Sequence, residues 1–280
     1  MTPFFDRVIA SKREGQNIVY AEPYAGGAGT AINLLLSGKV HSIMINDAAI
    51  GIYSFWHSLV NEGDRFIQMI RNTPVDLIEW KRQRQVFKSA RTPSFELGFA
   101  TFYLCRTNRS GILSAGPIGG QDEKMQKEAT YKIDCRFNKM DLIARIQRII
   151  EQRHRIAVSN LDALDFLRQI NDKYALVYLD PPYYDQGKAL YLNYYQHEDH
   201  VKLANYLRYQ ARFDWVLSYD NVPAILSLYA DFPLYQFNLS YTAQDVKQGS
   251  ELLTHSPGLQ FPCPLNIKKK GGHISIMGIT

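Results

Sequence analysis

The chain has 280 residues, of which 46% are hydrophobic and 21% are charged, and its formal net charge is +5. This length and apolar content are enough to bury a sizeable core, which indicates a globular protein. The sequence lacks the run of about 18 apolar residues that a membrane span needs and the basic-then-apolar start of a signal peptide. We therefore expect a cytoplasmic protein with no membrane contact.

Cysteines are too few and too widely spaced for a disulfide scaffold or a Cys-x-x-Cys metal knuckle; they are Cys105, Cys135 and Cys263. Positive charge is concentrated in the middle third of the chain. Residues 81–91 read KRQRQVFKSAR, with five basic residues and no acid. Such a region suits a polyanionic partner.

The first elements form a strand, turn, helix and strand. Residues 18–24 predict a buried strand that stops at Pro23, and AGGAG predicts a turn before an apolar helix ending near Gly38. Residues 40–46 predict a second strand, which Asp47 closes. This order requires a parallel sheet with right-handed crossovers.

The pattern changes to longer amphipathic helices between about residues 51 and 155, for example at 54–71 and 97–104. A glycine-rich connector lies at 108–120, where the sequence reads NRSGILSAGPIGG. We interpret this region as an inserted, mainly helical module.

Alternating strands and helices resume after the insert. We expect strands at 155–161, 175–179 and 215–218, helices at 163–170, 198–212 and 223–229, and an antiparallel pair at 234–241 and 251–256. The tail from Lys268 carries no clear pattern, and Lys268 to Lys270 are expected to fray. The predicted fold class is therefore α/β, with a mostly parallel sheet and an antiparallel edge.

The glycine turn after the first strand suits a ligand, because closely spaced glycines and a following helix N-terminus expose main-chain N–H groups. As a dinucleotide motif it is incomplete, since Ile32 stands where a third glycine belongs. Asp47 lies about 20 residues further on, where such folds place the acid that binds ribose hydroxyls. Together they favour a nucleoside-bearing cofactor, although a plain tight turn and a helix-capping aspartate remain open.

The stretch LVYLDPPYY ends a buried strand with a carboxylate, two prolines and an aromatic pair. Asp180 would lie at the carboxyl end of a parallel strand, where α/β folds bind ligands. The Pro181-Pro182 pair fixes the backbone and leaves carbonyls as acceptors, and Tyr183 offers a flat ring. Two acceptors and a stacking surface suit the exocyclic amine of a nucleobase; the alternative is a proline-rich turn with a capping aspartate.

Four segments in this order resemble motifs of the D12-class (Dam-like) adenine-N6 DNA methyltransferases: AEPYAGGAGTA, IND at 45–47, NLDALDF at 160–166 and LVYLDPPYY at 176–184. Weaker similarities are NRSG at 108–111, YDN at 219–221 and GSELL at 249–253. The resemblance covers nearly the whole chain. It implies a Rossmann-like S-adenosylmethionine-dependent methyltransferase fold, with the catalytic core at 1–51 and 156–280 and an inserted helical target-recognition domain at 52–155.

The resemblance also implies the roles of individual residues. S-adenosylmethionine would be bound by Glu22, Pro23, Tyr24, Gly26, Gly27, Gly29, Asp47, Asp162 and Asp180. The catalytic residues would be Asp180, Pro181, Pro182 and Tyr183, which would hold and stack on an adenine flipped out of double-stranded DNA. The DNA contacts would come from Arg106, Asn108, Arg109 and Ser110. No metal is expected, and a restriction endonuclease is a possible partner.

One departure from the family pattern concerns the cofactor site. Members usually begin with a Gly-Gly-Lys segment, and nothing before Ile18 resembles it. A methyltransferase-like DNA-binding protein with an incomplete cofactor pocket therefore stays open as a second hypothesis. A third hypothesis keeps the chemistry but changes the substrate to RNA or a protein glutamine; the basic insert and Asp180, where those relatives more often carry Asn, make it the weakest.

Overall fold

The computed structural model describes residues 1–11, 17–171, 174–184, 195–241, 249–262, 265–269 and 272–278. The chain forms two compact units: the first is Met1–Asn46 with Leu161–Thr280, and the second is Asp47–Asn160. The second unit includes the whole of the segment 52–155 that the sequence assigns to an insert. None of the described helices is long and apolar enough to cross a membrane.

The first unit alternates strands and helices. Its elements are α1 (Thr2–Ala10), β1 (Val19–Glu22), α2 (Gly29–Leu36), β2 (Ser42–Asn46), α9 (Ala163–Gln169), β4 (Leu176–Leu179), α11 (His197–Tyr209), β5 (Asp214–Asp220), α12 (Pro223–Leu228), β6 (Leu234–Tyr241), β7 (Gly249–His255), β8 (Leu265–Lys269) and β9 (Gly272–Gly278). Every strand and helix that the sequence predicts for this unit is found, with shifts of a few residues at the ends.

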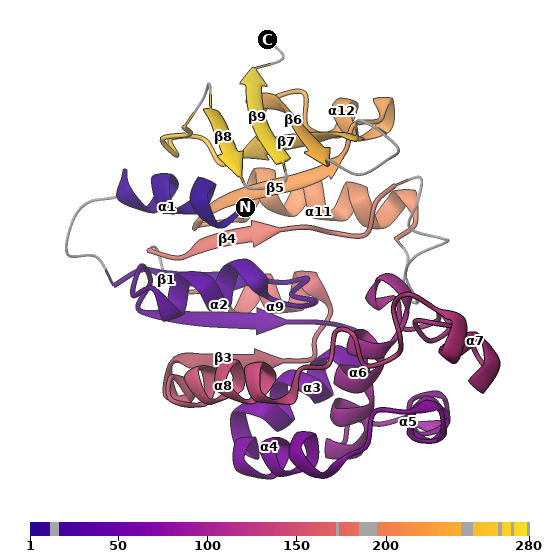
Figure 1. The fold of residues 1–280 in the computed structure, drawn as a ribbon. Helices are drawn as coiled ribbons and strands as arrows, with labels where there is room; N and C mark the ends of the chain where they lie inside the picture. The colour runs from indigo at the N-terminus through magenta and orange to yellow at the C-terminus, as the bar shows by residue number, and fades with distance from the viewer. Residues whose placement is uncertain are drawn as a thin grey trace. The chain divides into compact units, whose positions relative to one another are not determined.

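Within the first unit, the described strands form one sheet in the order β2-β1-β4-β5-β7-β6-β9-β8 (Figure 1); β3 (Ile156–Ser159) belongs to the second unit. Strands β2, β1, β4 and β5 pair in parallel. The pairs β5 with β7, β7 with β6, β6 with β9 and β9 with β8 are antiparallel. The predicted parallel core with an antiparallel edge is confirmed, and the antiparallel part is larger than predicted.

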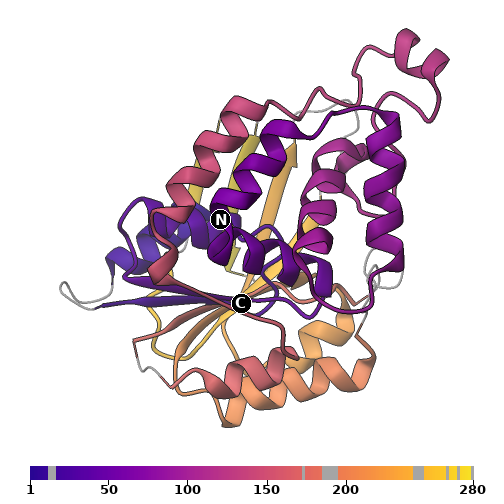
Figure 2. The same cartoon turned by 90° about the horizontal axis from the view of Figure 1, so that it is seen from below.

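Side chains alternate between the two faces of the sheet because successive residues of a strand point in opposite directions. On one face, Ala21, Val177 and Leu217 pack in an apolar core with side chains of α9, α11 and α12. Figure 2 shows these three helices together below the sheet, with α1 and α2 on the opposite side. The residues next to these in the strands, such as Glu22 and Ser218, therefore face the side of α1 and α2.

The prediction of a frayed tail at Lys268 to Lys270 is wrong where the structure describes it. Lys268 and Lys269 lie in β8, which pairs with β9, and β9 pairs with β6; Lys270 lies outside the described residues. The signal was the alternation in β9, which reads GHISIMG and buries Ile276 completely. The lysine-rich composition before it concealed that pattern.

Helix α1 was not predicted, although its apolar residues have helical spacing. It buries Phe4, Phe5, Val8 and Ile9, which are three to four residues apart along one side. The ring of Phe5 lies 5.4 Å from that of Tyr20 in β1 and 5.1 Å from that of Tyr178 in β4. Helix α1 therefore covers the face of β1 and β4 that carries polar side chains.

The second unit is mainly helical, as predicted. It contains α3 (Ile50–Asn61), α4 (Gly63–Asn72), α5 (Leu77–Ser89), α6 (Phe95–Thr107), the 3-10 turn η1 (Arg109–Gly111), α7 (Glu123–Glu128), α8 (Lys139–Ile150), the 3-10 turn η2 (Arg153–Arg155) and β3. An aromatic-rich core, which includes Phe66, Phe99, Phe102 and Phe137, joins α4, α6 and the segment before α8.

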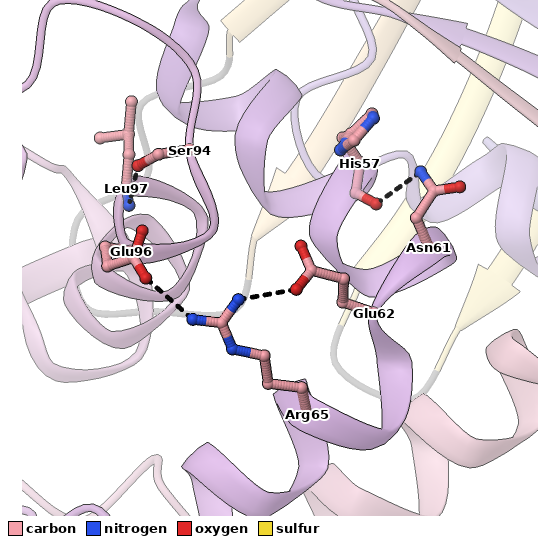
Figure 3. A network of polar contacts seen from close by, with 7 residues as sticks. All are labelled: His57, Asn61, Glu62, Arg65, Ser94, Glu96 and Leu97. Carbon is pink, nitrogen blue, oxygen red and sulfur yellow. Dashed lines mark hydrogen bonds and ion pairs between the residues drawn. The ribbon is translucent and has the colours of Figure 1, made fainter.

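The single helix predicted at 54–71 is in fact two helices, which break at Glu62 (φ −127°, ψ 34°). Gly63 follows directly and packs so closely on Ile150 that a Cβ there would overlap its side chain. Arg65 then bonds to Glu62 at 2.7 Å and to Glu96 of α6 at 2.9 Å, as Figure 3 shows. The amphipathic period continues across the break, which is why the sequence pattern did not reveal it.

Candidate functional site

The loop after β1 leaves its backbone open. Gly26 (φ +47°) and Ala28 (φ +44°) take left-handed conformations, and the Ala28 N–H bonds to the Ala25 carbonyl at 2.6 Å. A Cβ built on Gly26, Gly27 or Gly29 would meet no atom within 4 Å. A ligand can therefore approach this main chain closely, and α2 begins at Gly29 without a side-chain cap from its own first residues.

Glu22, at the end of β1, forms a hydrogen bond to the main chain of helix α2. Its Oε1 accepts a hydrogen bond from the Ala31 N–H at 3.1 Å, and the residue is only 5% exposed. Burial raises the pKa of Glu22 to about 7, and the negative charge of Asp180 adds to this, whereas the Ala31 N–H and the Tyr20 hydroxyl act in the opposite direction. Glu22 is thus a buried acid that titrates near neutral pH.

Asn46 is a structural residue that the sequence reasoning did not single out. Its Nδ2 donates to the carbonyls of Pro23 and Leu161, each at 3.0 Å, and its Oδ1 accepts from the Leu161 N–H at 2.9 Å. The Ala25 N–H also bonds to the Asn46 carbonyl at 2.9 Å. Asn46 therefore joins the ends of β1 and β2 to the segment before α9. In the triplet IND, the asparagine thus forms these bonds directly before the aspartate that the resemblance assigns to the cofactor.

Both aspartates that the resemblance assigns to the cofactor nucleoside accept local main-chain bonds. Asp47, in the second unit, accepts from the Ala49 N–H at 2.9 Å, and Asp162 caps α9 by accepting from the Leu164 N–H, also at 2.9 Å. Asp162 is exposed. Asp162 is the N-cap residue of α9, whereas the N-cap residue of α3 is Ala49 and the Asp47 side chain bonds to the N–H of that residue; the ribose and adenine roles stay predictions.

Asp180 follows β4 directly and is held by a chain of hydroxyl groups. Ser218 Oγ donates to Asp180 Oδ1 at 2.9 Å, and the Tyr178 hydroxyl lies 2.9 Å from Ser218 Oγ. Since the single proton of Ser218 goes to Asp180, Tyr178 must be the donor to Ser218. Asp180 is accessible to solvent, yet the surrounding protein raises the pKa of its carboxyl group by desolvation, and the Ser218 bond opposes this.

Tyr183 and Tyr184, the next residues after the two prolines, are each bonded to an acid on a neighbouring strand. The Tyr183 hydroxyl donates to Glu251 Oε1 of β7 at 2.8 Å. The Tyr184 N–H donates to Asp220 Oδ1 of β5 at 3.0 Å. The Asp-Pro-Pro-Tyr-Tyr turn is therefore attached to the sheet on the side of β5 and β7.

The glycine loop and this turn leave the sheet at the same edge. Strands β1 and β4 are parallel neighbours, with Tyr20 opposite Leu176 and Ala21 opposite Val177. Continuing this register places Glu22 level with Tyr178, about 5 Å away across the sheet. The influence of Asp180 on the pKa of Glu22 agrees with this placement. The structure thus brings together the two segments on which the sequence hypothesis depends.

Tyrosine and histidine side chains line the same region. The Tyr24 and Tyr195 hydroxyls lie 2.8 Å apart, and the buried His200 bonds through Nδ1 to the Tyr219 hydroxyl at 2.6 Å. Burial lowers the pKa of His200, so its ring is neutral at pH 7. Tyr24, predicted to contact the cofactor, is therefore fixed by a partner across the fold.

In the second unit, Asn108 lies inside the protein. It is 0% exposed; its Oδ1 accepts from Trp80 Nε1 at 2.7 Å, and its Nδ2 donates to the carbonyls of Ile112 and Leu113 at 2.9 and 3.1 Å. Its donors and acceptor are thus used to shape the loop that follows. The direct DNA contact that the resemblance implies for Asn108 has no support in this geometry.

The other three residues of the predicted DNA contact differ in exposure. Arg109 and Ser110 are exposed, and Ser110 takes a left-handed conformation (φ 54°). Arg106 is half-buried, and its Nε donates to the Arg136 carbonyl at 3.0 Å. Burial and the nearby charges of Arg136 and Arg145 lower the pKa of Arg106. Arg109 is therefore the strongest of the four candidates for an external partner.

Comparison with known proteins gives one family. A model of the D12 class N6 adenine-specific DNA methyltransferases matches residues 2–243. No curated protein sequence matches the chain significantly. Among solved structures, the chain is similar to the rRNA methyltransferase aviRa from Streptomyces viridochromogenes. The sequence identity is 10%, and the match covers 98% of this chain and 82% of that one. The TM-score is 0.34, which is too low to support a conclusion about function. Because the family model spans most of the residues, the chain belongs to the D12 class of N6 adenine-specific DNA methyltransferases.

Proposed function

We propose that this protein transfers a methyl group from S-adenosylmethionine to the N6 amine of an adenine flipped out of double-stranded DNA, at a specific DNA sequence. Membership of the family implies S-adenosylmethionine-dependent methylation of adenine in DNA. The observation that carries the proposal for this chain is the common edge of β1 and β4, where the open glycine loop and the Asp180 turn follow adjacent strands.

The residues present fit the cofactor. Gly26, Gly27 and Gly29 leave space above the main chain for the methionine part, and Glu22, Pro23 and Tyr24 would lie beside it. Bound S-adenosylmethionine supplies a methyl group activated on a sulfonium. The carboxylates of Glu22 and Asp180 would favour positive charge at this edge of the sheet, and the charge of Asp180 raises the pKa of Glu22.

Asp180 and Pro181 would hold the target amine. Ser218 occupies Asp180 Oδ1, and within the described residues no bond is made by Oδ2, which leaves it free to accept from N6. The Pro181 carbonyl would accept the second N–H while Tyr183 stacks on the base. Held by both protons, the amine directs its lone pair toward the methyl group, and Asp180 stabilises the positive charge that develops on nitrogen.

The hydrogen bond from Ser218 to Asp180 should affect how kcat/KM depends on pH. Ser218→Ala removes a donor that favours the ionised form, so the pKa of Asp180 rises further and the acid limb of kcat/KM moves to higher pH. We expect a loss of about tenfold at pH 6 that becomes smaller toward pH 9. Exposed Ser227 of α12 is the matched control, as Ser227→Ala. Equal losses at both pH values would contradict the role of Ser218.

The second unit is proposed as the target-recognition domain. Its helix α5 presents the exposed cations Lys81, Arg82 and Lys88. Arg109 and Ser110 project from a loop whose ends are closed by the bond from the Arg109 N–H to the Gly116 carbonyl at 3.0 Å. Lysine and arginine would neutralise phosphates, and a few side chains would read base edges.

Arg109→Ala is expected to weaken DNA binding and to reduce the slope of log K against log salt by about 1. Binding is measured by fluorescence anisotropy at several salt concentrations. Arg168→Ala, which removes the same charge from α9 where Arg168 pairs with Asp165, is the control and should leave the slope unchanged. An unchanged slope for Arg109→Ala would remove Arg109 from the phosphate contacts.

The competing function is a methyltransferase-like DNA-binding protein with an incomplete cofactor pocket. Isothermal titration with S-adenosylmethionine separates the two. Saturable binding with a micromolar Kd supports the enzyme, whereas binding to DNA without any heat from the cofactor supports the alternative.

A further inference from the structure

Two acids face each other across the sheet beside the Asp-Pro-Pro-Tyr-Tyr turn. In the antiparallel pair of β5 and β7, Asp220 is directly opposite Glu251. Side chains of opposite residues lie on the same face, and like charges there are destabilising. Burial raises the pKa of Glu251, and the charges of Asp180 and Asp220 raise it further. The pairing is thus unfavourable by itself and requires compensating partners.

The partners are consecutive residues of the turn. Glu251 accepts from the Tyr183 hydroxyl at 2.8 Å, and Asp220 accepts from the Tyr184 N–H at 3.0 Å. The bond from Tyr183 opposes the other influences on Glu251, because it lowers the pKa of the acid. The two acids therefore hold the side chain of one tyrosine and the main chain of the next.

Tyr183 is held both at its main chain and at its hydroxyl group. On the main-chain side, Pro181 and Pro182 fix the backbone that carries it. On the hydroxyl side, Glu251 binds the far end of the ring, so that rotation about the two side-chain torsions is restricted in the protein before any DNA is bound. A phenylalanine in this place would offer the same stacking surface without the second attachment.

We propose that Glu251 is a positioning residue, which fixes the ring of Tyr183 in the orientation for stacking on the target adenine. The inference rests on the proposed function, because it concerns the same site. Glu251 bonds to the tyrosine hydroxyl, at the opposite end of the turn from the Asp180 carboxyl group that would hold N6. Its effect is therefore expected on the turnover of bound DNA and not on cofactor affinity.

A double-mutant cycle tests this assignment. Glu251→Ala and Tyr183→Phe should each lower kcat on unmethylated genomic DNA about tenfold, which corresponds to about 1.4 kcal/mol. Since both remove the same bond, the double variant should lose about tenfold as well, and not the hundredfold that independent effects would give. The Kd for S-adenosylmethionine should stay within about twofold in all three.

Conservative and control variants separate positioning from general destabilisation. Glu251→Gln keeps an acceptor for the hydroxyl and should retain kcat within about threefold of the parent protein. Exposed Glu198 of α11 supplies the matched control, as Glu198→Ala, with unchanged kcat. Thermal unfolding identifies any variant whose loss reflects folding, and Tyr183→Phe keeps the test informative if Glu251→Ala does not fold.

Two outcomes would overturn the inference: multiplicative losses in the double variant, or full activity of both Glu251→Ala and Tyr183→Phe. The failure of the proposed function is seen separately, because the parent protein would then form no N6-methyladenine at all. If the parent is active and the cycle is multiplicative, only the role of Glu251 is lost.

Discussion

Asp180→Ala is expected to lower the rate of methyl transfer by about 100-fold or more while DNA affinity stays within about twofold. The carboxylate lies at the end of β4, with Oδ1 bound by Ser218, and we propose that it accepts from the amine and stabilises the developing charge. Its removal should leave the second compact unit, which we propose for DNA recognition, unchanged.

The measurement pairs a single-turnover rate at saturating DNA and cofactor with an anisotropy titration of DNA. Asp165→Ala, at an exposed acid of α9 that pairs with Arg168, is the matched control and should keep the parent rate. Survival of more than about a tenth of the rate in Asp180→Ala would refute its catalytic role.

Glu22→Gln is expected to change how stability depends on pH in the absence of cofactor. The folded pKa of about 7 lies above the ordinary 4.5, so between these values the folded state holds a proton that the unfolded state has released. The contribution of protonated Glu22 is therefore complete below pH 4.5 and is lost as pH rises through 7, by about 3 kcal/mol in total.

Glutamine keeps an acceptor for the Ala31 N–H but has no proton to lose. The variant should therefore gain stability relative to the parent as pH increases, with most of the difference developing between pH 5 and 7. Urea unfolding at pH 5, 6, 7 and 8 measures this difference in free energy. Parallel pH curves for the two proteins would show that Glu22 is ionised in the folded state throughout this range.

The site could be predicted from sequence as far as local patterns reach. Asp180 and the glycine loop were identified because each follows an apolar strand, and the logic of a parallel α/β sheet places strand ends at one edge. The neighbouring positions of β1 and β4 then follow from the fold class, although about 150 residues separate them in the chain.

The sequence could not predict those hydrogen-bond partners that depend on how distant strands align in the sheet. Ser218 meets Asp180 because β5 pairs with β4 in a particular register, and Glu251 meets Tyr183 because β7 pairs with β5 in another. A shift of one residue in either pairing would turn the side chain to the other face. The burial of Asn108 was not predicted for a related reason. Its place in the protein interior depends on Trp80 of α5, which lies 28 residues earlier.

We propose that the tip of β4 holds an adenine amine for methylation. Incubation of the protein with unmethylated mixed DNA and methyl-labelled S-adenosylmethionine, followed by digestion to nucleosides and chromatography, tests it directly. We expect the label in N6-methyldeoxyadenosine, with its rate of incorporation lower by about 100-fold or more in Asp180→Ala. Label in a methylated cytosine, or no label in DNA under conditions where the cofactor binds, would show that this site does not methylate adenine.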